Sequence, residues 1–560
     1  MKGLSILFLL TFIFFAGYAQ VRSFPEAQGA GAAAIGGRGG RIIEVKNLNN
    51  SGAGSLREAC SATGPRIVVF RVSGIIDLTD LIYIGNPYIT IAGQTAPGGG
   101  VVVRGIKNPS NRGVLFYIET NNVVIRYMRL RHGYNSSLTN LQGKNIVLSD
   151  GAENIIVDHC SMSWAQDKNF SAWGYDTNKP IRNVSIQHCI ISEPIEDQYG
   201  NATGMLIGGG GDLIAQGQIN LDVHHNFYCS NRHRDPLFKG ASGRIVNNIA
   251  YNYGNYALGW EGGAKLDIIG NIYKDGPVAS SNKEIAYRDD PDNAVIGSPS
   301  IFILGNKGPH NANPQTDNWP MMEKRTTWQT PGVALNTSLR RTTKQTDGAF
   351  PITINTVAEL ENLMFAEVGA GKRLDADGLL IPNRDAVDTR LINDYKNVKG
   401  VFLTSGKGGE AEVGGYPAIA AGTVYTDTDK DGMSDNWEKK YCFNPNDDAD
   451  GNKDFDSDGY TNVEEFLNGS VPSACLITAL DQTHVNKTIS ISPNPGNSKI
   501  SIHGNISEGA SYEITSIEGK SIQTGVLSDR QISIENIHSG IYILKIKTDA
   551  GNVVQRFVKE

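Results

Sequence analysis

Short apolar segments recur along the first half of the chain, and each ends in a similar four-residue pattern. The patterns are IAGQ (91–94), IRYM (125–128), VDHC (157–160), IQHC (186–189), VHHN (223–226), IVNN (245–248) and IIGN (268–271). Their last residues are spaced by 34, 32, 29, 37, 22 and 23 positions. A minimum near 22 with a variable excess is typical of a coil of short strands whose loops differ in length. The repeat therefore predicts an all-β fold, a right-handed parallel β-helix.

The same repeat predicts what lies inside the coil. Equivalent residues on successive turns stack about 4.8 Å apart, so Asn226, Asn248 and Asn271 are expected to form an internal amide ladder. Cys160 and Cys189 occupy adjacent steps of one column. Buried stacked thiols are favoured there over a disulfide, because parallel Cβ vectors suit a bridge poorly.

An open coil needs a cover at each end. The segment SGAGSLREAC (51–60) predicts a capped helix at the first end. At the other end, TVAELENLMFAEVGAG (356–371) and RDAVDTRLINDY (384–395) predict two amphipathic helices. The β-helix with its covers is expected to span residues 21–415, followed by a Gly-rich linker at 416–424.

Two acidic segments follow within residues 425–470. DTDKDGMSDNWE (427–438) and DFDSDGYTNVEE (454–465) start 27 residues apart and share one spacing of oxygen-bearing side chains around a glycine. The candidate ligands are Asp427, Asp429, Asp431, Asp435, Glu438, Asp454, Asp456, Asp458, Asn462 and Glu465. Calcium binds six to eight oxygens in compact loops with a Gly at the turn. A solvated acidic linker explains neither the glycines nor the terminal glutamates, so the pattern predicts structural Ca²⁺.

The two ends of the chain carry signals of export. Residues 1–20 place one lysine before a short apolar run that ends in small residues, which is typical of a cleaved signal peptide. Beyond a second linker at 471–485, residues 486–560 contain strands with period-two alternation and predict a small β-sandwich. We expect a secreted or cell-surface protein, and a monomer.

Composition excludes one class of partner and leaves one pairing open. The net charge of −7 comes without a broad basic stripe, so no nucleic-acid partner is expected. Six cysteines in 560 residues do not form a disulfide framework. Cys442 and Cys475 are candidates for a single bridge that the sequence does not assign.

One basic cluster stands out against this acidic background. The segment NRHRDPLFKG (231–240) gathers Arg232, His233, Arg234 and Lys239 around a proline, directly after the VHHN strand. A solvated turn or a general anion site is the simpler interpretation of such a cluster taken alone. The alternative is a local receptor for an acidic substrate.

Several segments together resemble the pectate lyases of polysaccharide lyase family 1. They are FPEAQGAGAAAIGGRGG, NLNNSGAGSLREA, GPRIVVFRVSGIIDL, ITIAGQTAPGGG, NIIVDHCSMSW and NRDAVDTRLI, within residues 24–400. The acidic double loop is similar to thrombospondin type 3 or dockerin-like calcium modules. The tail resembles the C-terminal sorting domain of type IX secretion, which implies contact with an outer-membrane secretion machinery.

The resemblance implies a lyase that breaks pectate, an acidic plant polysaccharide, by β-elimination. The family's catalytic pattern falls on Arg234 as the base and on Lys239 as a cation for a substrate carboxylate, with Arg232 and His233 as further substrate-binding residues. Arginine is an unusual base, because its ordinary pKa is about 12.5 or higher. Nearby cations, partial desolvation and bound calcium would all penalise a charged guanidinium.

The sequence departs from the family where the substrate cleft holds calcium. Asn145 and Asp167 stand at expected metal-ligand positions, Ser171 replaces a second acid, and Thr203 stands where the family has a lysine. These departures leave two alternatives open: a pectin lyase or hydrolase-like relative without cleft calcium, and a non-catalytic glycan-binding β-helix.

Overall fold

The protein is described by a computed structural model that covers residues 21–105, 113–135, 143–176, 178–196, 200–209, 219–277, 282–289, 298–328, 330, 332–472, 490–503, 509–516, 520–548 and 551–560. The expected signal peptide, residues 1–20, lies outside these ranges. The chain divides into two compact units, residues 1–471 and 472–560.

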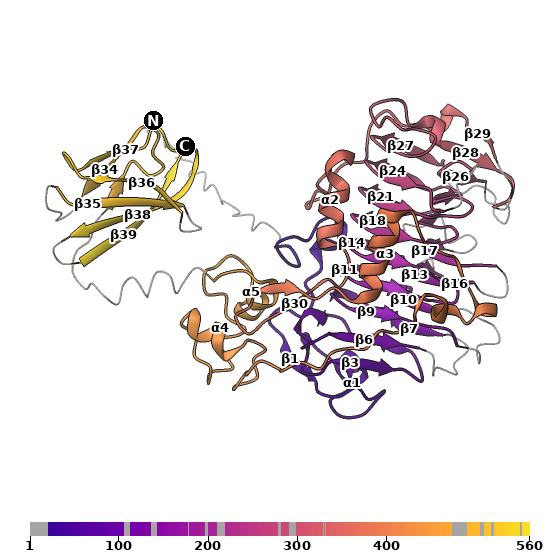
Figure 1. Ribbon diagram of the computed structural model, residues 1–560, viewed down its shortest axis with the longest axis horizontal. Coiled ribbons are helices and arrows are strands. Elements are labelled where there is room, and N and C mark those ends of the chain that lie inside the picture. Colours follow the sequence, from indigo (N-terminus) through magenta and orange to yellow (C-terminus); the bar gives the residue numbers. More distant parts are fainter. Residues whose placement is uncertain are drawn as a thin grey trace, which may run out of the picture. The chain divides into compact units, whose positions relative to one another are not determined.

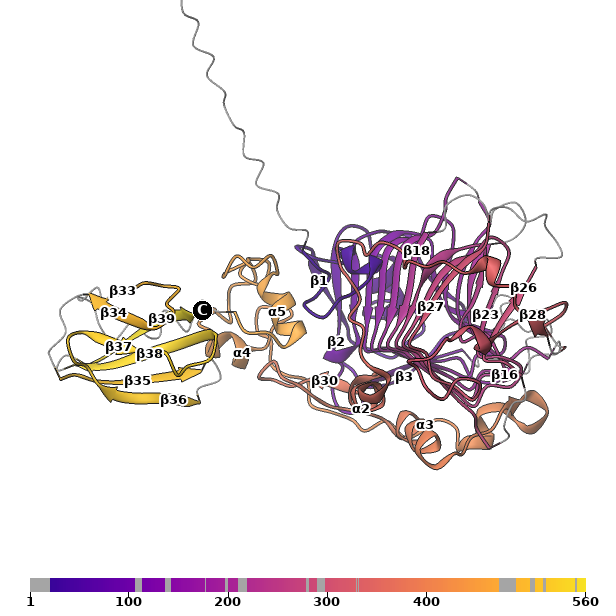
Figure 2. The same ribbon diagram turned by 90° about the horizontal axis from the view of Figure 1, so that it is seen from above.

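Three long sheets form the first unit (Figures 1 and 2). Sheet 1 has ten parallel strands: β1 (Arg41–Val45), β2 (Arg66–Phe70), β5 (Ile89–Ala92), β8 (Asn121–Arg126), β11 (Glu153–Asp158), β14 (Arg182–Gln187), β18 (Ile219–His224), β21 (Ser242–Val246), β24 (Lys265–Ile269) and β27 (Ser300–Leu304). Sheet 2 has eight: β3 (Gly74–Asp77), β6 (Val101–Arg104), β9 (Arg129–Arg131), β12 (Ser161–Ser163), β15 (Ile190–Ser192), β19 (Phe227–Cys229), β22 (Ile249–Tyr251) and β25 (Ile272–Lys274).

Sheet 3 completes each coil. Its strands are β4 (Ile82–Ile84), β7 (Val114–Ile118), β10 (Lys144–Leu148), β13 (Lys168–Gly174), β17 (Thr203–Gly209), β20 (Leu237–Lys239), β23 (Leu258–Glu261), β26 (Ile285–Arg288) and β28 (Met322–Arg325), with β29 (Val333–Ala334) pairing antiparallel at the edge. The chain visits sheets 1, 2 and 3 in turn, and strands of successive coils pair in parallel. The predicted parallel β-helix is confirmed.

The predicted ladder lies at the turn between sheets 1 and 2. Asn226 Nδ2 donates to Asn248 Oδ1 at 3.0 Å, and Asn248 Nδ2 donates to Asn271 Oδ1 at 3.0 Å. The ladder continues to Asn306 at 2.9 Å and from there to Asn318 at 3.1 Å. Cys160 and Cys189 are buried free thiols in the same column, as expected.

The covers of the coil are only partly where the sequence placed them. Helix α1 (Leu56–Ser61) buries Leu56 and Cys60 in the main core at the first end, as predicted. Helices α2 (Val357–Glu367) and α3 (Ala386–Asn397) do not cover the other end. They pack on the outer face of sheet 2, because residues such as Phe227 and Ile249 make that face apolar.

Shorter elements complete the first unit. Strand pairs β16 (Ile195–Glu196) with β32 (Leu403–Thr404) and β30 (Lys372–Leu374) with β31 (Leu380–Pro382) flank the coil. The 3₁₀ turns are η1 (Ala30–Ala33), η2 (Gly93–Thr95), η4 (Trp319–Met321), η5 (Thr337–Leu339), η6 (Ser405–Lys407) and η7 (Gly409–Val413). Within the described residues, no helix combines the length and apolar character needed to cross a bilayer.

The acidic loops pack on the β-helix. They carry α4 (Asp435–Lys440) and α5 (Asn462–Asn468), whose Trp437 and Phe466 share an apolar cluster with Ile67 and Val69 of β2. Residues 416–424, the expected linker, also run along the coil, where Gly99 N donates to Ala420 O at 2.8 Å. Cys442 is disulfide-bonded, and its candidate partner Cys475 lies outside the described residues.

The second unit contains two antiparallel sheets. One has three strands, β33 (Ser490–Ser492), β34 (Lys499–His503) and β37 (Gln531–Ser533). The other has four, β35 (Ser511–Ser516), β36 (Ser521–Val526), β38 (Gly540–Thr548) and β39 (Gly551–Lys559). Ile500, Leu544 and Phe557 belong to one buried apolar cluster shared by both sheets.

Candidate active site

The backbone at Arg234 is fixed by the neighbouring coil. It lies in the turn between β19 and β20 and takes a left-handed conformation, with φ of 67°. Arg234 O accepts from Met205 N at 2.7 Å. Gly204 allows this close approach, since a Cβ there would lie 2.2 Å from Asp235 Oδ1. The turn therefore presents Arg234 at one end of β17.

The side chain of Arg234 is partly exposed and is not consumed by an ion pair. Among the described residues it forms no salt bridge, and its Nε has no hydrogen-bond partner. Its charge acts on Asp167, Lys168 and Tyr256, which places the guanidinium next to these groups. A guanidinium in this setting is available to a ligand.

Lys239 lies in sheet 3 one turn of the coil before Glu261. Its Nζ is 3.2 Å from Glu261 Oε1, and Glu261 also accepts from Arg288 at 2.8 Å. The three residues are in register on successive strands. Two cations thus share one carboxylate that is 4% exposed, and this row has a net charge of +1.

The other two residues of the basic cluster contact other side chains. Arg232 binds Glu196 at 2.9 Å and lies over the ring of Phe402. The ring of His233 is buried, and its centroid lies 5.5 Å from that of Tyr256. Burial and the adjacent Arg234 hold the pKa of His233 well below its usual range. The expected contact of His233 with substrate stays a prediction, and the burial of its ring leaves little surface for such a contact.

Sequence reasoning missed two lysines next to this turn. Lys168 Nζ lies 2.6 Å from both carboxylate oxygens of Asp167, and Lys144 Nζ lies 3.1 Å from Asp167 Oδ2. Lys144, Lys168 and Thr203 are in register on successive strands of sheet 3. Only their pairing across the sheet brings the lysines together, so no local motif signals them.

A cleft calcium ion does not fit this arrangement. Asn145 faces the interior, where its Nδ2 donates to Ser163 O at 3.0 Å and to Asn169 Oδ1 at 2.9 Å. The expectation that Asn145 is a metal ligand is corrected on this ground. Asp167 is the remaining predicted ligand, and two ammonium groups already hold it. Within the part of the chain that the structure describes, one carboxylate beside two cations does not offer the six or more oxygens that Ca²⁺ needs.

The acidic loops do fit a metal. Carboxylate oxygens of Asp427, Asp429 and Asp431 lie within 4.8 Å of one another, as do those of Asp454, Asp456 and Asp458. A third such group joins Asp431 and Glu438 to Asp450, a residue that the sequence analysis did not select. Both oxygens of Glu438 are buried without a hydrogen-bond partner in the described structure, as is Asp450 Oδ1.

The electrostatics of these loops also favour a bound metal ion. Burial and neighbouring carboxylates raise the pKa of Asp431 and of Glu438 to about 8. In the second loop Glu465 Oε2 and Asn462 Oδ1 are buried without partners among the described residues. A bound cation would stabilise the charged form of these crowded carboxylates.

Asp435 is an exception among the predicted loop ligands. Its Oδ1 accepts from Thr428 N at 2.9 Å and its Oδ2 accepts from Thr428 Oγ1 at 2.9 Å. It belongs to neither acidic group of the first loop in the described structure. Asp435 therefore closes the loop rather than facing the metal position.

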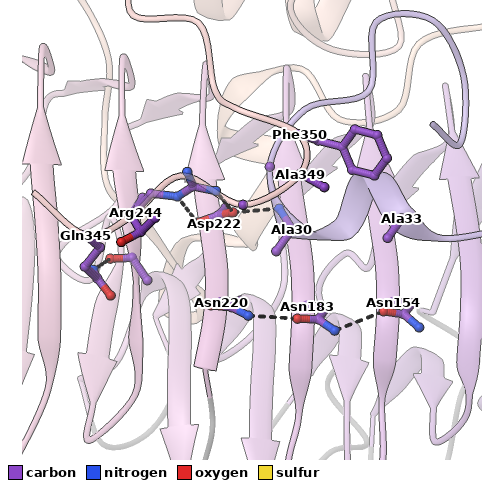
Figure 3. Close-up of a pocket in the computed structure, with 14 residues that line it drawn as sticks. Ala30, Ala33, Asn154, Asn183, Asn220, Asp222, Arg244, Gln345, Ala349 and Phe350 are labelled. Atoms are coloured by element: carbon purple, nitrogen blue, oxygen red, sulfur yellow. Dashed lines mark hydrogen bonds and ion pairs between the residues drawn. The ribbon is translucent and has the colours of Figure 1, made fainter. Parts of the chain in front are cut away.

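A separate cavity of about 300 Å³ lies on the outer face of sheet 1 (Figure 3). Asn154, Asn183 and Asn220 form a hydrogen-bonded row along one side of it. Its charged residues are paired, since Arg244 binds Asp222 at 2.6 Å and Asp347 at 2.9 Å. The cavity lies between sheet 1 and the segments that cover it. Its lining does not include Arg234 or the lysines near Arg234.

Most of the chain is similar to known proteins. A family model described as "Pectate lyase" matches residues 14–303, and one described as "Secretion system C-terminal sorting domain" matches residues 490–560. The Aspergillus flavus protein named "Probable pectate lyase C" is 33% identical over 463 residues, which cover 81% of this chain and 94% of that protein. The "Probable pectate lyase 12" of Arabidopsis thaliana is 26% identical over 289 residues, covering 47% and 54%.

Solved structures with a similar fold have lower sequence identity. The cedar pollen allergen jun a 1 has a TM-score of 0.45 and 14% identity, covering 61% of this chain and 92% of its own. A pectate lyase from Bacillus sp. N165 in complex with trigalacturonate has a TM-score of 0.42 and 13% identity, covering 61% and 98%.

Proposed function

The chain belongs to the pectate lyase family, and we propose from this that it cleaves pectate, or a related uronate polymer, by β-elimination with Arg234 as the base. The observation that carries the assignment is that Arg234 is partly exposed and forms no ion pair within the described residues. Lys168 and Lys239 lie on the strands around it and suit a polymer with about one carboxylate per sugar.

In the proposed reaction, neutral Arg234 takes the proton from C5, the carbon next to the substrate carboxylate. The electron pair of the C5–H bond forms a double bond to C4, and the bond from C4 to the glycosidic oxygen breaks. The leaving oxygen then gains a proton, so the net change moves one proton from C5 to that oxygen. No water is added across the bond, which distinguishes elimination from hydrolysis.

The remaining basic residues have supporting roles in this proposal. Lys239 binds a substrate carboxylate while Glu261 holds its ammonium group in place. Arg232 and His233 position the turn that carries Arg234, because one is tied to Glu196 and the other is buried against Tyr256.

Calcium belongs to the acidic loops in this account. Asp427, Asp429, Asp431, Glu438 and Asp450 would hold one ion, and Asp454, Asp456, Asp458, Asn462 and Glu465 a second. The ions would neutralise crowded carboxylates, among them the buried Asp431 and Glu438. Its role is structural, because the loops pack on β2 rather than on sheet 3.

The sorting domain gives the protein its destination. Residues 490–560 match a secretion sorting domain, and the protein is secreted or attached to the cell surface. A polymer of plant cell walls is too large to enter a cell, so an exported enzyme is consistent with such a substrate.

The test is to incubate the full chain with polygalacturonate and follow ultraviolet absorbance of the new C4–C5 double bond. Unsaturated uronides are expected. New reducing ends without this absorbance would indicate a hydrolase, and binding without any product would indicate a glycan-binding β-helix. Either result contradicts the proposal.

A further inference from the structure

The Arg234 site contains a carboxylate, that of Asp167, which is paired with two lysines. Asp167 is 2% exposed, and Lys168 contacts both of its oxygens at 2.6 Å. Lys144 reaches the same carboxylate at 3.1 Å from the preceding coil. Two positive charges thus converge on a single negative one.

This group is joined to Arg234 by one short strand segment. Thr203 N and Thr203 Oγ1 donate to Asp167 O at 3.0 and 2.9 Å. Two residues further on, Met205 N donates to Arg234 O at 2.7 Å. The lysine pair and the base therefore lie on neighbouring coils, and the charge of Arg234 acts on both Asp167 and Lys168.

The charges of the group favour an anion over a cation. Lys144, Lys168 and Arg234 are three cations, and Asp167 is one anion, so their net charge is +2. A divalent cation placed against Asp167 would lie beside two ammonium groups, which repel it. A carboxylate in the same place would be attracted by both lysines and by Arg234.

We propose that Lys168 and Lys144, held by Asp167, bind a substrate carboxylate next to Arg234 in place of a divalent cation. This rests on the proposed lyase function and adds two consequences to it. The site works without a metal ion of its own, and it prefers polymers whose carboxylates are free over polymers whose carboxylates are methyl esters.

The first experiment measures binding without turnover. A galacturonate hexamer is titrated into Arg234→Ala and into Arg234→Ala combined with Lys168→Gln, by calorimetry, with thermal unfolding as the check on folding. Removing one charged partner from a carboxylate should weaken binding by about tenfold or more. Lys168→Arg, which keeps the charge, should retain most of the binding. Lys265→Gln, an exposed lysine on sheet 1, is the matched control and should change nothing.

Equal affinities with and without Lys168→Gln overturn the inference, whatever the enzyme does in turnover assays. In those assays, wild type should favour polygalacturonate over methyl-esterified pectin, and Lys168→Gln should lose most of that preference. Absence of product from both polymers would count against the proposed function alone, because the binding comparison stands without it.

The second experiment counts metal. Bound calcium is measured after equilibrium dialysis for wild type and for Asp167→Asn. The two proteins should bind the same number of ions, since the acidic loops are intact in both. One ion fewer in Asp167→Asn would show that Asp167 is a metal ligand and would overturn the inference.

Discussion

The carboxyl group next to Arg234 has an unusual environment. Asp235 is buried, its Oδ1 accepts from Asn231 Nδ2 at 2.8 Å, and its Oδ2 has no partner among the described residues. Burial holds the pKa of Asp235 well above its usual range. The folded protein therefore keeps a proton there at pH values where the unfolded chain has lost it.

This arrangement predicts a pH dependence of stability. Because the folded state binds more protons, stability falls as pH rises above about 4, the ordinary carboxyl pKa, towards the raised value. Asp235→Asn should remove this fall, by about 1.4 kcal/mol for each unit by which the pKa is raised. Thermal unfolding of both proteins at pH 4.5 and pH 8 checks it. Parallel pH profiles would show that Asp235 does not titrate as argued.

Single residues differ in how far the sequence could predict them. Arg234 and Lys239 lie in one continuous sequence pattern, so both could be selected from the sequence alone. Lys144 and Lys168 are 24 residues apart and meet only through the register of sheet 3. Asn145 was misassigned because its position in the strand does not show whether the side chain faces inwards.

Among the structural elements, the buried amide ladder is expected to contribute strongly to the stability of the coil. Asn248 Oδ1 accepts from both Asn226 N and Asn226 Nδ2, and Asn248 Nδ2 donates to Val223 O. Asn248→Ala leaves these buried groups unpaired and should cost about 2–5 kcal/mol of unfolding free energy. The measurement is the midpoint of thermal or denaturant unfolding.

Asn220 supplies the control for this substitution. It belongs to the outer row of asparagines, it is exposed, and its φ is 59°. Asn220→Gly keeps that backbone conformation without strain, and water replaces the lost hydrogen bond. A change well under that of Asn248→Ala is expected. Similar losses for the two variants would contradict a special role for the buried ladder.

Periodicity predicted the turns of the coil better than it predicted where the helices pack on the coil. The repeat located the ladder from Asn226 to Asn271, but the next spacing of 35 residues to Asn306 hid its continuation. The two amphipathic helices were predicted as helices and misplaced as an end cover. Helical periodicity shows that a face is apolar and does not show which surface it meets.

At the scale of the whole molecule, the acidic loops join the β-helix through both charge and apolar packing. Arg71 binds Asp427 and Glu44, Arg38 binds Glu464, and Trp437 packs in the cluster with Ile67. The sequence predicted the loops from their spacing. Their docking was not predictable, because it depends on arginines 356 and 426 residues away in the chain.

Calcium removal should therefore destabilise the first unit. A ligand at 100 times its dissociation constant stabilises a protein by about 2.7 kcal/mol per site, so chelation should lower the unfolding temperature. Glu438→Gln should reduce the increase that added calcium produces. Asp435→Asn should keep it, since that carboxylate binds Thr428 instead. An unchanged calcium response in Glu438→Gln would refute the assignment of the first loop.

The second unit makes a separate prediction about location. Deleting residues 490–560 should leave the lyase activity per molecule unchanged, because the Arg234 site lies wholly in residues 1–471. The shortened protein should remain inside the producing cell rather than reach its surface or the medium. Fractionation followed by the polygalacturonate assay measures both effects, and normal export would contradict the role of the tail.

The most direct test of the account is the rate of double-bond formation by Arg234→Ala on polygalacturonate, compared with wild type at equal folded concentration. The account predicts a loss of at least a hundredfold, the low end for removal of a general base, with the thermal unfolding profile retained. Turnover near the wild-type rate in a folded Arg234→Ala protein would show that another group removes the proton, and the assignment of the base would be wrong.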